Sequence, residues 1–476
     1  MPARYGQYMN VSGVVDPPIR ASTRRAVAML ALISLLLTVG YGLYLQPDWE
    51  SYRDDQVEYL ALAHGLLDRG EFTRATQGEP FVPEPLRTPA YPLLRAGVCA
   101  LTGCDHWPIA IVQGLLCAAL VPLTFLIARR ALTERTALVA AIAVAAYLPF
   151  EYFAAIPLSD LPATTLLLAA VYATMRAIEA VSARWAIAAG VVLGALALTR
   201  PTFVLLPIAL VGAGATSVLG RWTVLRRLAL PALVLAVAYV AVLAPFLAYS
   251  YRYFGGPFAS SSGTGLWYGY VQGLGTGTAS ELDRFRAAAL AGAPVDAVRT
   301  AGAGIGFDPV ESVEAAAALR EIAAFNAIQG RLPQAYAWID LNASLARHAT
   351  TLIERDPVGW ALRGFTVRSV ELWSGEEPYR VRDALAGRPL ARVPLAIAHL
   401  WILGAGIAGA ILLLRRRPRE TIIIVTIPAY VWATSFPFVT EARYALPAMP
   451  FVLLAAIAAA IAFDQRRRAR RTARAR

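Results

Sequence analysis

AVAMLALISLLLTVGYGLYL, residues 26–45, is a run of 20 uncharged, mainly apolar residues. An α-helix needs about 20 apolar residues to cross the roughly 30 Å hydrocarbon core of a bilayer, so this run predicts a transmembrane helix. It lacks a small-residue cleavage site followed by soluble sequence, which favours a permanent span over a signal peptide. The whole chain of 476 residues is 57% hydrophobic and 16% charged, a composition that excludes an ordinary soluble protein.

Similar apolar blocks recur along the chain. We therefore predict an all-α polytopic membrane protein with about ten transmembrane helices. The predicted spans are residues 26–45, 107–127, 137–157, 161–178, 186–199, 202–218, 229–249, 393–414, 421–439 and 446–463.

The basic residues, all of them arginine, are sorted by connection. Every second connection and both tails are rich in arginine, so one side of the membrane would carry 23 arginines and 5 acidic residues. By the positive-inside rule this side is cytoplasmic, which places both termini in the cytoplasm of a cell with the protein in its inner (plasma) membrane. The net charge of +12 then reflects membrane orientation, and we expect no nucleic-acid partner.

This topology divides the chain into five parts and leaves two larger pieces outside. The outer piece before the second span carries Cys99 and Cys104; a disulfide between them is an option there, but we expect free thiols. The second outer piece begins with a glycine-rich stretch that indicates a linker or a lid. The parts are a cytoplasmic tail (1–25), an N-terminal transmembrane module (26–249) with its outer loop (46–106), an extracytoplasmic, mainly helical domain (250–392), C-terminal transmembrane helices (393–463) and a basic tail (464–476).

Two adjacent aspartates open the segment DDQVEYLALAHGLL, residues 54–67. Asp55 and Glu58 loosely fit a capping box at the start of a helix. Tyr59, Leu62, Ala63 and Leu66 follow at helical spacing, which predicts one apolar face and a helix lying on the bilayer surface. Asp54 is not needed as a cap, so the second carboxylate has no structural explanation.

Several other polar residues fall at the outer ends of predicted spans. Such groups are costly at membrane depth and usually face a cavity or a partner, although each one alone could instead snorkel to the interface. Because all of them lie on the same side as the two aspartates, we expect a shared outward-facing site. They are Asp160, Arg200, Glu441 and Arg443.

The segment PEPLRTPAYPLL, residues 83–94, places Arg87 in a turn stiffened by prolines. A guanidinium held there can grip a phosphate with two hydrogen bonds. The alternative is that Arg87 binds lipid headgroups without specificity.

These elements, in this order, resemble the GT-C glycosyltransferases that use polyprenyl-phosphate sugars. That superfamily includes the protein O-mannosyltransferases (glycosyltransferase family 39) and the lipid A aminoarabinose transferase. The sequence departs from the usual pattern at Gln56, where a second acid is common, and at Ala90, where glycine is commoner. The similar segments are DDQVEYLALAHGLLDRG, PLRTPAYPLL, LSDLPATTLLL, GVVLGALALTRPTFVLLP, HATTLIERDPVGWALRGFTVRSVELW and EARYALPAMPFVLL.

The resemblance implies a GT-C bundle and a reaction. An acceptor hydroxyl attacks the anomeric carbon of a sugar linked to a lipid phosphate, usually with inversion, and an aspartate of the first outer loop acts as general base. Alignment on Tyr59 favours Asp55 over Asp54, and we expect a raised pKa for this carboxyl near the bilayer. The resemblance assigns donor phosphate binding to Arg87, Arg200 and Arg443, and the orientation of sugar or metal to Glu58, Asp160, Glu441, Tyr91 and Tyr444.

The implied partners are a polyprenyl-phosphate-linked sugar, the lipid bilayer, and an acceptor that is a cell-envelope glycan, a lipid or a secreted protein. Some members of the superfamily need Mg²⁺ or Mn²⁺, and the sequence leaves the metal open; no His/Cys cluster suggests zinc.

The lysine-free, Ala- and Arg-rich composition indicates a GC-rich bacterium and hence a decaprenyl or undecaprenyl carrier. The alternative functions are a lipid-linked glycan flippase or other transporter, and an O-antigen-ligase-like or polymerase enzyme. A flippase would need polar residues along a path through the bilayer, whereas the predicted spans carry their charges at their ends. A ligase or polymerase would use a diphosphate donor, and the first-loop aspartate motif argues against it.

Overall fold

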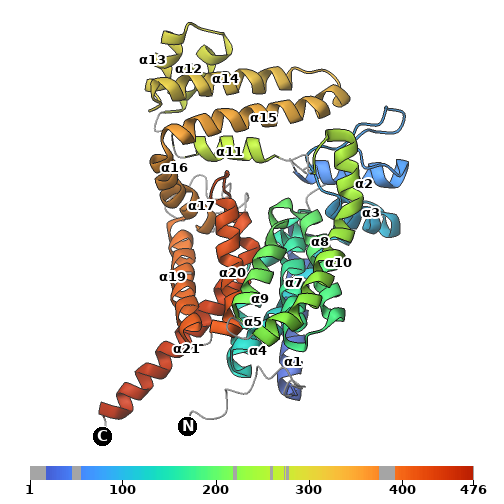
Figure 1. Cartoon of the computed structure of the whole chain (residues 1–476), viewed down its shortest axis with the longest axis vertical. Coiled ribbons are helices and arrows are strands. Elements are labelled where there is room, and N and C mark those ends of the chain that lie inside the picture. The colour runs from blue at the N-terminus through green and yellow to red at the C-terminus, as the bar shows by residue number, and fades with distance from the viewer. Residues whose placement is uncertain are drawn as a thin grey trace.

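The computed structural model describes residues 18–45, 55–217, 222–257, 261–272, 274, 278–374, 392–416 and 418–474. These residues form helices joined by loops and turns, and no strand occurs among them. A bundle of long helices fills the lower part of Figure 1, and a smaller group of helices lies above it. The predicted all-α membrane fold is therefore confirmed.

Among the described residues, six helices are long and apolar enough to cross a membrane. A pair of shorter helices, α5 (Glu134–Ala145) and α6 (Pro149–Ala155), is bent by 50° and makes a seventh span if it crosses as one unit. The long helices are α1 (Ala21–Leu45), α4 (His106–Ala131), α7 (Asp160–Ala180), α10 (Trp222–Phe254), α19 (Arg392–Arg416) and α21 (Met449–Arg474).

Three more predicted spans correspond to shorter apolar helices, namely α8 (Ala183–Thr199), α9 (Leu206–Ser217) and α20 (Pro418–Ser435). At 1.5 Å per residue, a helix of 17 residues is about 26 Å long, somewhat less than the hydrocarbon core. The count of ten spans therefore stays a prediction. The bend between α5 and α6 has a local cause, because Pro149 lacks an N–H and its ring clashes with the preceding turn.

Close helix packing in the bundle depends on small residues. Gly190 and Gly194 on α8 are four residues apart and face α10. A Cβ added at Gly190 would lie 2.4 Å from the carbonyl oxygen of Leu235, and one at Gly194 would lie 2.6 Å from Cβ of Val242. This is the small-residue spacing that lets two transmembrane helices approach backbone to backbone.

The upper helices have a core of their own, in which Trp267, Tyr270, Phe285 and Leu345 are buried. The glycine-rich stretch contains a regular helix, α11, rather than only the linker or lid that its composition indicates. Gly263 allows this helix to pack on its neighbour, since a Cβ there would overlap the backbone of α15. The upper helices are α11 (Ser262–Val271), α12 (Ala279–Leu290), α13 (Val295–Ala303), α14 (Pro309–Asn326) and α15 (Arg331–Arg355).

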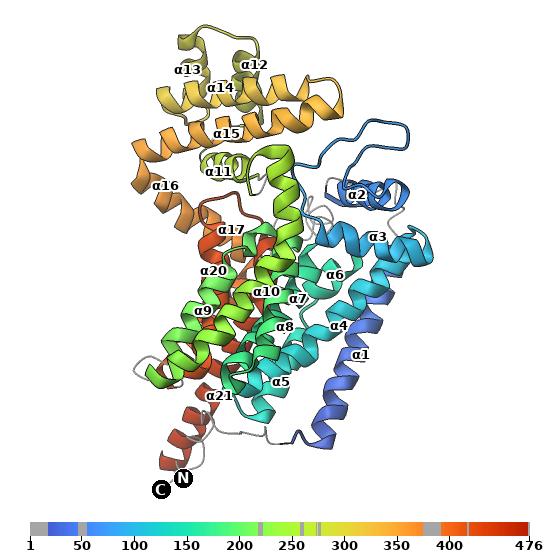
Figure 2. The same cartoon turned by 45° about the vertical axis from the view of Figure 1, so that its right-hand side comes forward.

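Two helices of the first outer loop, α2 (Asp55–Arg69) and α3 (Ala90–Thr102), lie at the top of the bundle in Figure 2. The apolar face predicted for α2 exists, but it packs against α3 rather than only against lipid: the rings of Tyr59 and Tyr91 meet edge to face at 4.7 Å. The predicted capping box is wrong, because the Asp55 and Glu58 carboxylates bind arginines instead of helix N–H groups.

The expectation of free outer thiols is also wrong, because Cys99 and Cys104 form a disulfide. Gly103 ends α3 with φ of +78°, a conformation that favours glycine, and the resulting turn brings the two Cα atoms to 4.4 Å. Cys117 is a free, buried thiol within α4.

Candidate functional site

Charged side chains from separate parts of the chain meet at the end of the bundle that faces the upper helices. We call them the charged cluster. All the predicted acidic and arginine site residues that the structure describes belong to it, whereas Asp54 lies outside the described residues. The cluster consists of Asp55 and Glu58 on α2, Arg87 in the turn before α3, Asp160 at the start of α7, Arg200 after α8, and Glu441 and Arg443 at the segment η5 (Ala442–Ala448).

Arg87 lies between the two carboxylates of α2. Its Nε donates to Oε2 of Glu58 at 2.6 Å, and its Nη2 donates to Oδ1 of Asp55 at 2.6 Å. The guanidinium also lies over the ring of Tyr59, 5.3 Å from the centroid. The side chain of Arg87 is only 19% exposed, so these charge-assisted bonds form in a poorly hydrated environment where they are strong.

Asp55 bridges two arginines. Its second oxygen, Oδ2, lies 3.4 Å from Nη1 of Arg443, which in turn donates from Nε to Glu441 at 2.6 Å. Burial alone would raise the pKa of the Asp55 carboxyl, but the charges of Arg87, Arg443 and Arg200 outweigh burial and hold that pKa below its usual value. The predicted raised pKa is therefore wrong for the protein in this state, because sequence patterning could not show that three guanidinium groups surround the carboxylate.

The second half of the cluster is built on an aromatic ring. Arg200 forms an ion pair with Asp160, whose side chain is 3% exposed. Arg200 and Arg443 both lie over the ring of Tyr444, at 5.1 and 5.5 Å from its centroid, and the Tyr444 hydroxyl donates to Glu441 at 3.3 Å. This ring therefore fixes the separation of two cations that would otherwise repel each other.

Two residues that the sequence interpretation missed hold Arg87 in place. Glu84 is buried, and its Oε1 accepts from the backbone N–H groups of Leu86 and Arg87 at 2.8 and 3.0 Å. Its other oxygen lies 2.6 Å from Nε of Arg74, which also donates from Nη1 to Glu58 at 2.7 Å. The signal was present in the sequence, since Glu84 stands between two prolines three residues before Arg87.

The tyrosines near the cluster differ in their roles. The Tyr59 hydroxyl lies 3.1 Å from the Ser159 hydroxyl, next to Asp160. The Tyr91 hydroxyl instead donates to Oε1 of Gln113 in α4 at 2.7 Å, away from the charged cluster. The structure therefore brings Tyr444 and Tyr59 to the cluster and leaves Tyr91 as a contact between α3 and the bundle.

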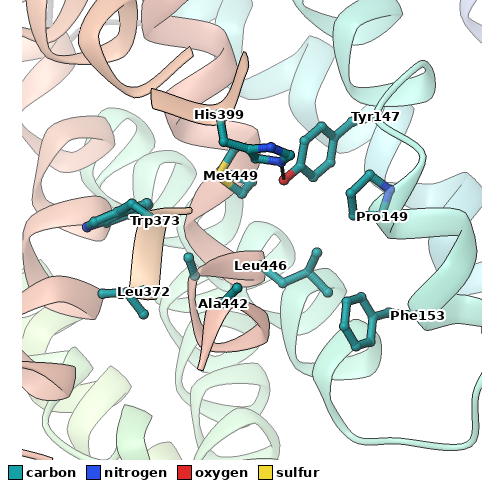
Figure 3. Close-up of a pocket in the computed structure, with 10 residues that line it drawn as sticks. Tyr147, Pro149, Phe153, Leu372, Trp373, His399, Ala442, Leu446 and Met449 are labelled. Atoms are coloured by element: carbon teal, nitrogen blue, oxygen red, sulfur yellow. Dashed lines mark hydrogen bonds between the residues drawn. The ribbon is translucent and has the colours of Figure 1, made fainter. Parts of the chain in front are cut away.

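A small, open pocket lies on the other side of η5. Figure 3 shows its mainly apolar lining, with one polar pair in which the Tyr147 hydroxyl and Nε2 of His399 are 2.9 Å apart. Ala442 and Leu446 of η5 face this pocket, whereas Arg443 and Tyr444 of the same segment belong to the charged cluster. The lining residues are Tyr147, Pro149, Phe153, Leu372, Trp373, His399, Ala442, Ala445, Leu446 and Met449.

The carboxylates of the cluster do not form a metal site. Within the described part of the chain, no group of three or more His, Cys, Asp or Glu side chains is arranged to hold a metal ion. Asp55, Glu58 and Asp160 each pair with an arginine, and a divalent cation needs carboxylates that are not already neutralised. As they are paired here, the described carboxylates of the cluster do not fit Mg²⁺ or Mn²⁺.

Comparisons with known proteins agree on a fold. Residues 85–249 match the family described as dolichyl-phosphate-mannose-protein mannosyltransferase. The oligosaccharyltransferase of Archaeoglobus fulgidus in its apo form is similar over 95% of this chain and 52% of its own, with 14% identity and a TM-score of 0.52. The same enzyme, AglB, in complex with an inhibitory peptide and a dolichol-phosphate is similar over 96% and 52%, with 14% identity and a TM-score of 0.50.

ArnT from Cupriavidus metallidurans bound to undecaprenyl phosphate matches over 92% of this chain and 78% of its own, with 16% identity and a TM-score of 0.41. No curated protein matches the chain in sequence. The chain spans about half the length of the archaeal oligosaccharyltransferases that it resembles. Over residues 85–249 the chain therefore resembles the protein O-mannosyltransferase family, and its fold is similar to that of the archaeal oligosaccharyltransferase.

Proposed function

We propose that this chain transfers a monosaccharide from a polyprenyl-phosphate donor to an acceptor hydroxyl on the extracytoplasmic face of the membrane, with inversion. The observation that carries the proposal is the position of Asp55, an ionised carboxylate between Arg87 and Arg443 at one end of the bundle. A base and a set of phosphate-binding cations in contact with each other are what this transfer requires.

In the proposed step, the acceptor oxygen forms a bond to the anomeric carbon and its proton passes to Asp55. The bond between that carbon and the phosphate oxygen breaks at the same time, and the electron pair leaves with polyprenyl phosphate. The phosphate changes from a diester with one negative charge to a monoester that gains a second. Arg87, Arg200 and Arg443 stabilise that developing charge, which is the largest electrostatic change in the reaction.

The surroundings of the cluster suit an amphipathic donor. The pocket behind η5 is lined mainly by apolar side chains, while Arg443 of the same short segment belongs to the charged cluster. A lipid whose phosphate binds the arginines can place part of its hydrocarbon chain against the bundle. Glu441 and Tyr444 are candidates to orient sugar hydroxyls, since both have oxygen atoms at the cluster.

Two observations support an extracytoplasmic site in the inner membrane. In Figure 1 the start of α1 and the arginine-rich end of α21 lie at the lower end of the bundle, whereas α2, which carries Asp55 and Glu58, lies at its upper end. The Cys99–Cys104 disulfide lies on the side of the cluster, and disulfides persist in oxidising compartments. The proposed acceptor is accordingly a cell-envelope glycan, a lipid or a secreted protein.

The test is sugar transfer by aspartate variants in membranes. Asp55→Asn is expected to abolish transfer while protein level and insertion stay normal, and Asp54→Asn is the matched control. Activity in Asp55→Asn with loss in Asp54→Asn would move the base by one residue, and full activity in both would sink the mechanism. Lipid-linked sugars and envelope glycans that change in a deletion strain would identify the donor and the acceptor.

A further inference from the structure

The guanidinium of Arg87 is only partly engaged. Its Nε and Nη2 both lie 2.6 Å from Oε2 of Glu58, and Nη2 also lies 2.6 Å from Oδ1 of Asp55. Within the described residues, no protein oxygen accepts from Nη1 of Arg87, and this atom is not among the side-chain nitrogens enclosed by protein. Nη1 is therefore accessible to a ligand.

A guanidinium has two edges that can bind an oxyanion with two parallel hydrogen bonds. The edge formed by Nε and Nη2 is occupied by Glu58. On the edge formed by Nη1 and Nη2, one N–H group is accessible and the other donates to Asp55. A phosphate that binds this second edge with two oxygens needs the N–H group that Asp55 accepts.

We propose that the donor phosphate and the Asp55 carboxylate compete for the Nη1–Nη2 edge of Arg87, so that donor binding itself releases Asp55 to act as the base. This inference rests on the proposed function. Glu58 is the positioning residue in this exchange. It stays bound to the Nε–Nη2 edge of Arg87 while the Nη1–Nη2 edge exchanges Asp55 for phosphate.

The exchange accounts for a carboxylate that is a poor base before the donor arrives. Burial raises the pKa of Asp55, and Arg87 is the largest of the charges that lower it. When phosphate takes its bond to Arg87, Asp55 keeps only the more distant Arg443 and Arg200, and its proton affinity rises. The charged or titratable groups near Asp55 are Arg87, Arg443 and Arg200 from other elements, and Glu58 and Tyr59 from α2 itself.

The test measures the affinity of undecaprenyl phosphate, the carrier without sugar, for the purified full-length protein. Asp55→Asn is expected to bind it about tenfold more tightly than the wild type, because one charge-assisted bond no longer has to break. In an Arg87→Lys background, which keeps the charge and lacks the second edge, the same aspartate change is expected to give less than about a twofold gain, since the coupling between the two residues is lost.

Glu441→Gln is the matched control, because it removes a negative charge from the cluster without touching Arg87. Equal tightening in Asp55→Asn and Glu441→Gln, or none in Asp55→Asn while Arg87→Ala still weakens binding, would overturn the exchange and leave the proposed function standing. Unchanged affinity in Arg87→Ala would instead overturn the phosphate role of Arg87 itself. Asp55→Ala replaces Asp55→Asn if thermal unfolding shows that the latter does not fold.

Discussion

Arg87 and Arg368 are both mostly buried arginines, and their surroundings are opposite. Arg87 binds two carboxylates and has one N–H edge partly accessible. Arg368, in the π-helical segment η3 (Gly364–Arg368), is fully buried and donates to three backbone carbonyls, those of Phe436, Gly269 and Trp360, each at 2.9 Å.

We propose that the difference separates a ligand-binding arginine from a structural one. Arg368 joins α11, α16 (Pro357–Arg363) and the end of α20, and lies over the rings of Trp360 and Phe436. Burial, with the charge of Arg363 next, lowers its pKa to about 10, yet it stays charged at neutral pH. Each of its three side-chain nitrogens donates to a backbone carbonyl of the fold, whereas we propose that Arg87 exchanges one carboxylate partner, Asp55, for another anion.

The largest expected effect is on the Arg87 side of this comparison. Arg87→Ala removes a donor to the leaving phosphate, and we expect kcat/KM to fall by about a hundredfold or more. The unfolding temperature should change little, because Asp55 keeps Arg443 and Glu58 keeps Arg74. Transfer assays and thermal unfolding of the same preparation measure both; a large loss of stability would make Arg87 a structural residue like Arg368.

Arg368→Met is expected to show the reverse pattern. It leaves three buried carbonyl groups without their donor, and we expect a loss of about 3 kcal/mol in the free energy of unfolding. Arg368→Lys should not rescue stability, because an ammonium group cannot reach three divergent carbonyls and stack between two rings. Normal stability with lost transfer activity would show that Arg368 takes part in the reaction.

The sequence predicted one of these arginines and not the other. Prolines that stiffen its turn point to Arg87, and Asp160, Arg200 and Arg443 stand out because ionisable groups at membrane depth are costly and usually face a cavity or a partner. The sequence around Arg368, GFTVRSVELW, has no such mark, because a carbonyl-bound arginine depends on backbone positions that lie far apart in the chain.

The ion pairs within the cluster were also beyond prediction. Charge sorting placed the residues on one side of the membrane, but the pKa direction of Asp55 depends on distances of a few ångströms between side chains from α2, the turn before α3 and η5. The Cys99–Cys104 disulfide was missed for the same reason, since the turn at Gly103 that permits it is a backbone property.

Glu84 provides a test of a residue that positions Arg87 without binding the ligand itself. In Glu84→Gln the amide oxygen can still accept from the backbone N–H groups, but the amide nitrogen cannot accept from Arg74. We expect the KM for the donor to rise about tenfold with kcat nearly unchanged, because Arg87 is held less firmly. The matched control is Glu79→Gln, an exposed carboxylate of the same loop, which should leave both constants unaltered. Equal effects of the two substitutions would contradict a positioning role.

The disulfide at the C-terminal end of α3 should matter for stability more than for transfer. Cys99→Ser opens a loop with a sequence separation of 5 residues. Chain entropy then predicts a loss of about 2 kcal/mol in the free energy of unfolding. Thermal unfolding with and without reductant measures the effect, and the wild type treated with reductant should match the variant. A loss of transfer without a loss of stability would show that the bond shapes the site itself.

The smallest expected effect is in the pH profile of the free enzyme. A carboxyl whose pKa is below its usual value of about 3.9 stays ionised as pH falls, so Asp55 is expected to cause no decline in kcat/KM between about pH 8 and pH 5. The lowered pKa also makes stability depend on pH. The ion pairs of Asp55 with arginines stabilise the folded protein above the pKa that Asp55 has in the unfolded chain, and this stabilisation is lost as pH falls through its folded-state pKa. Asp55→Asn should therefore lower the unfolding temperature at pH 7 and lose that difference toward pH 3.

In Arg87→Gln the main charge that lowers the pKa of Asp55 is gone while burial persists, so the residual activity of that variant should decline at higher pH than that of the wild type. An acid limb at the same pH in both proteins would mean that Arg87 does not control the proton affinity of Asp55, and the contrast with Arg368 would then rest on hydrogen bonding alone.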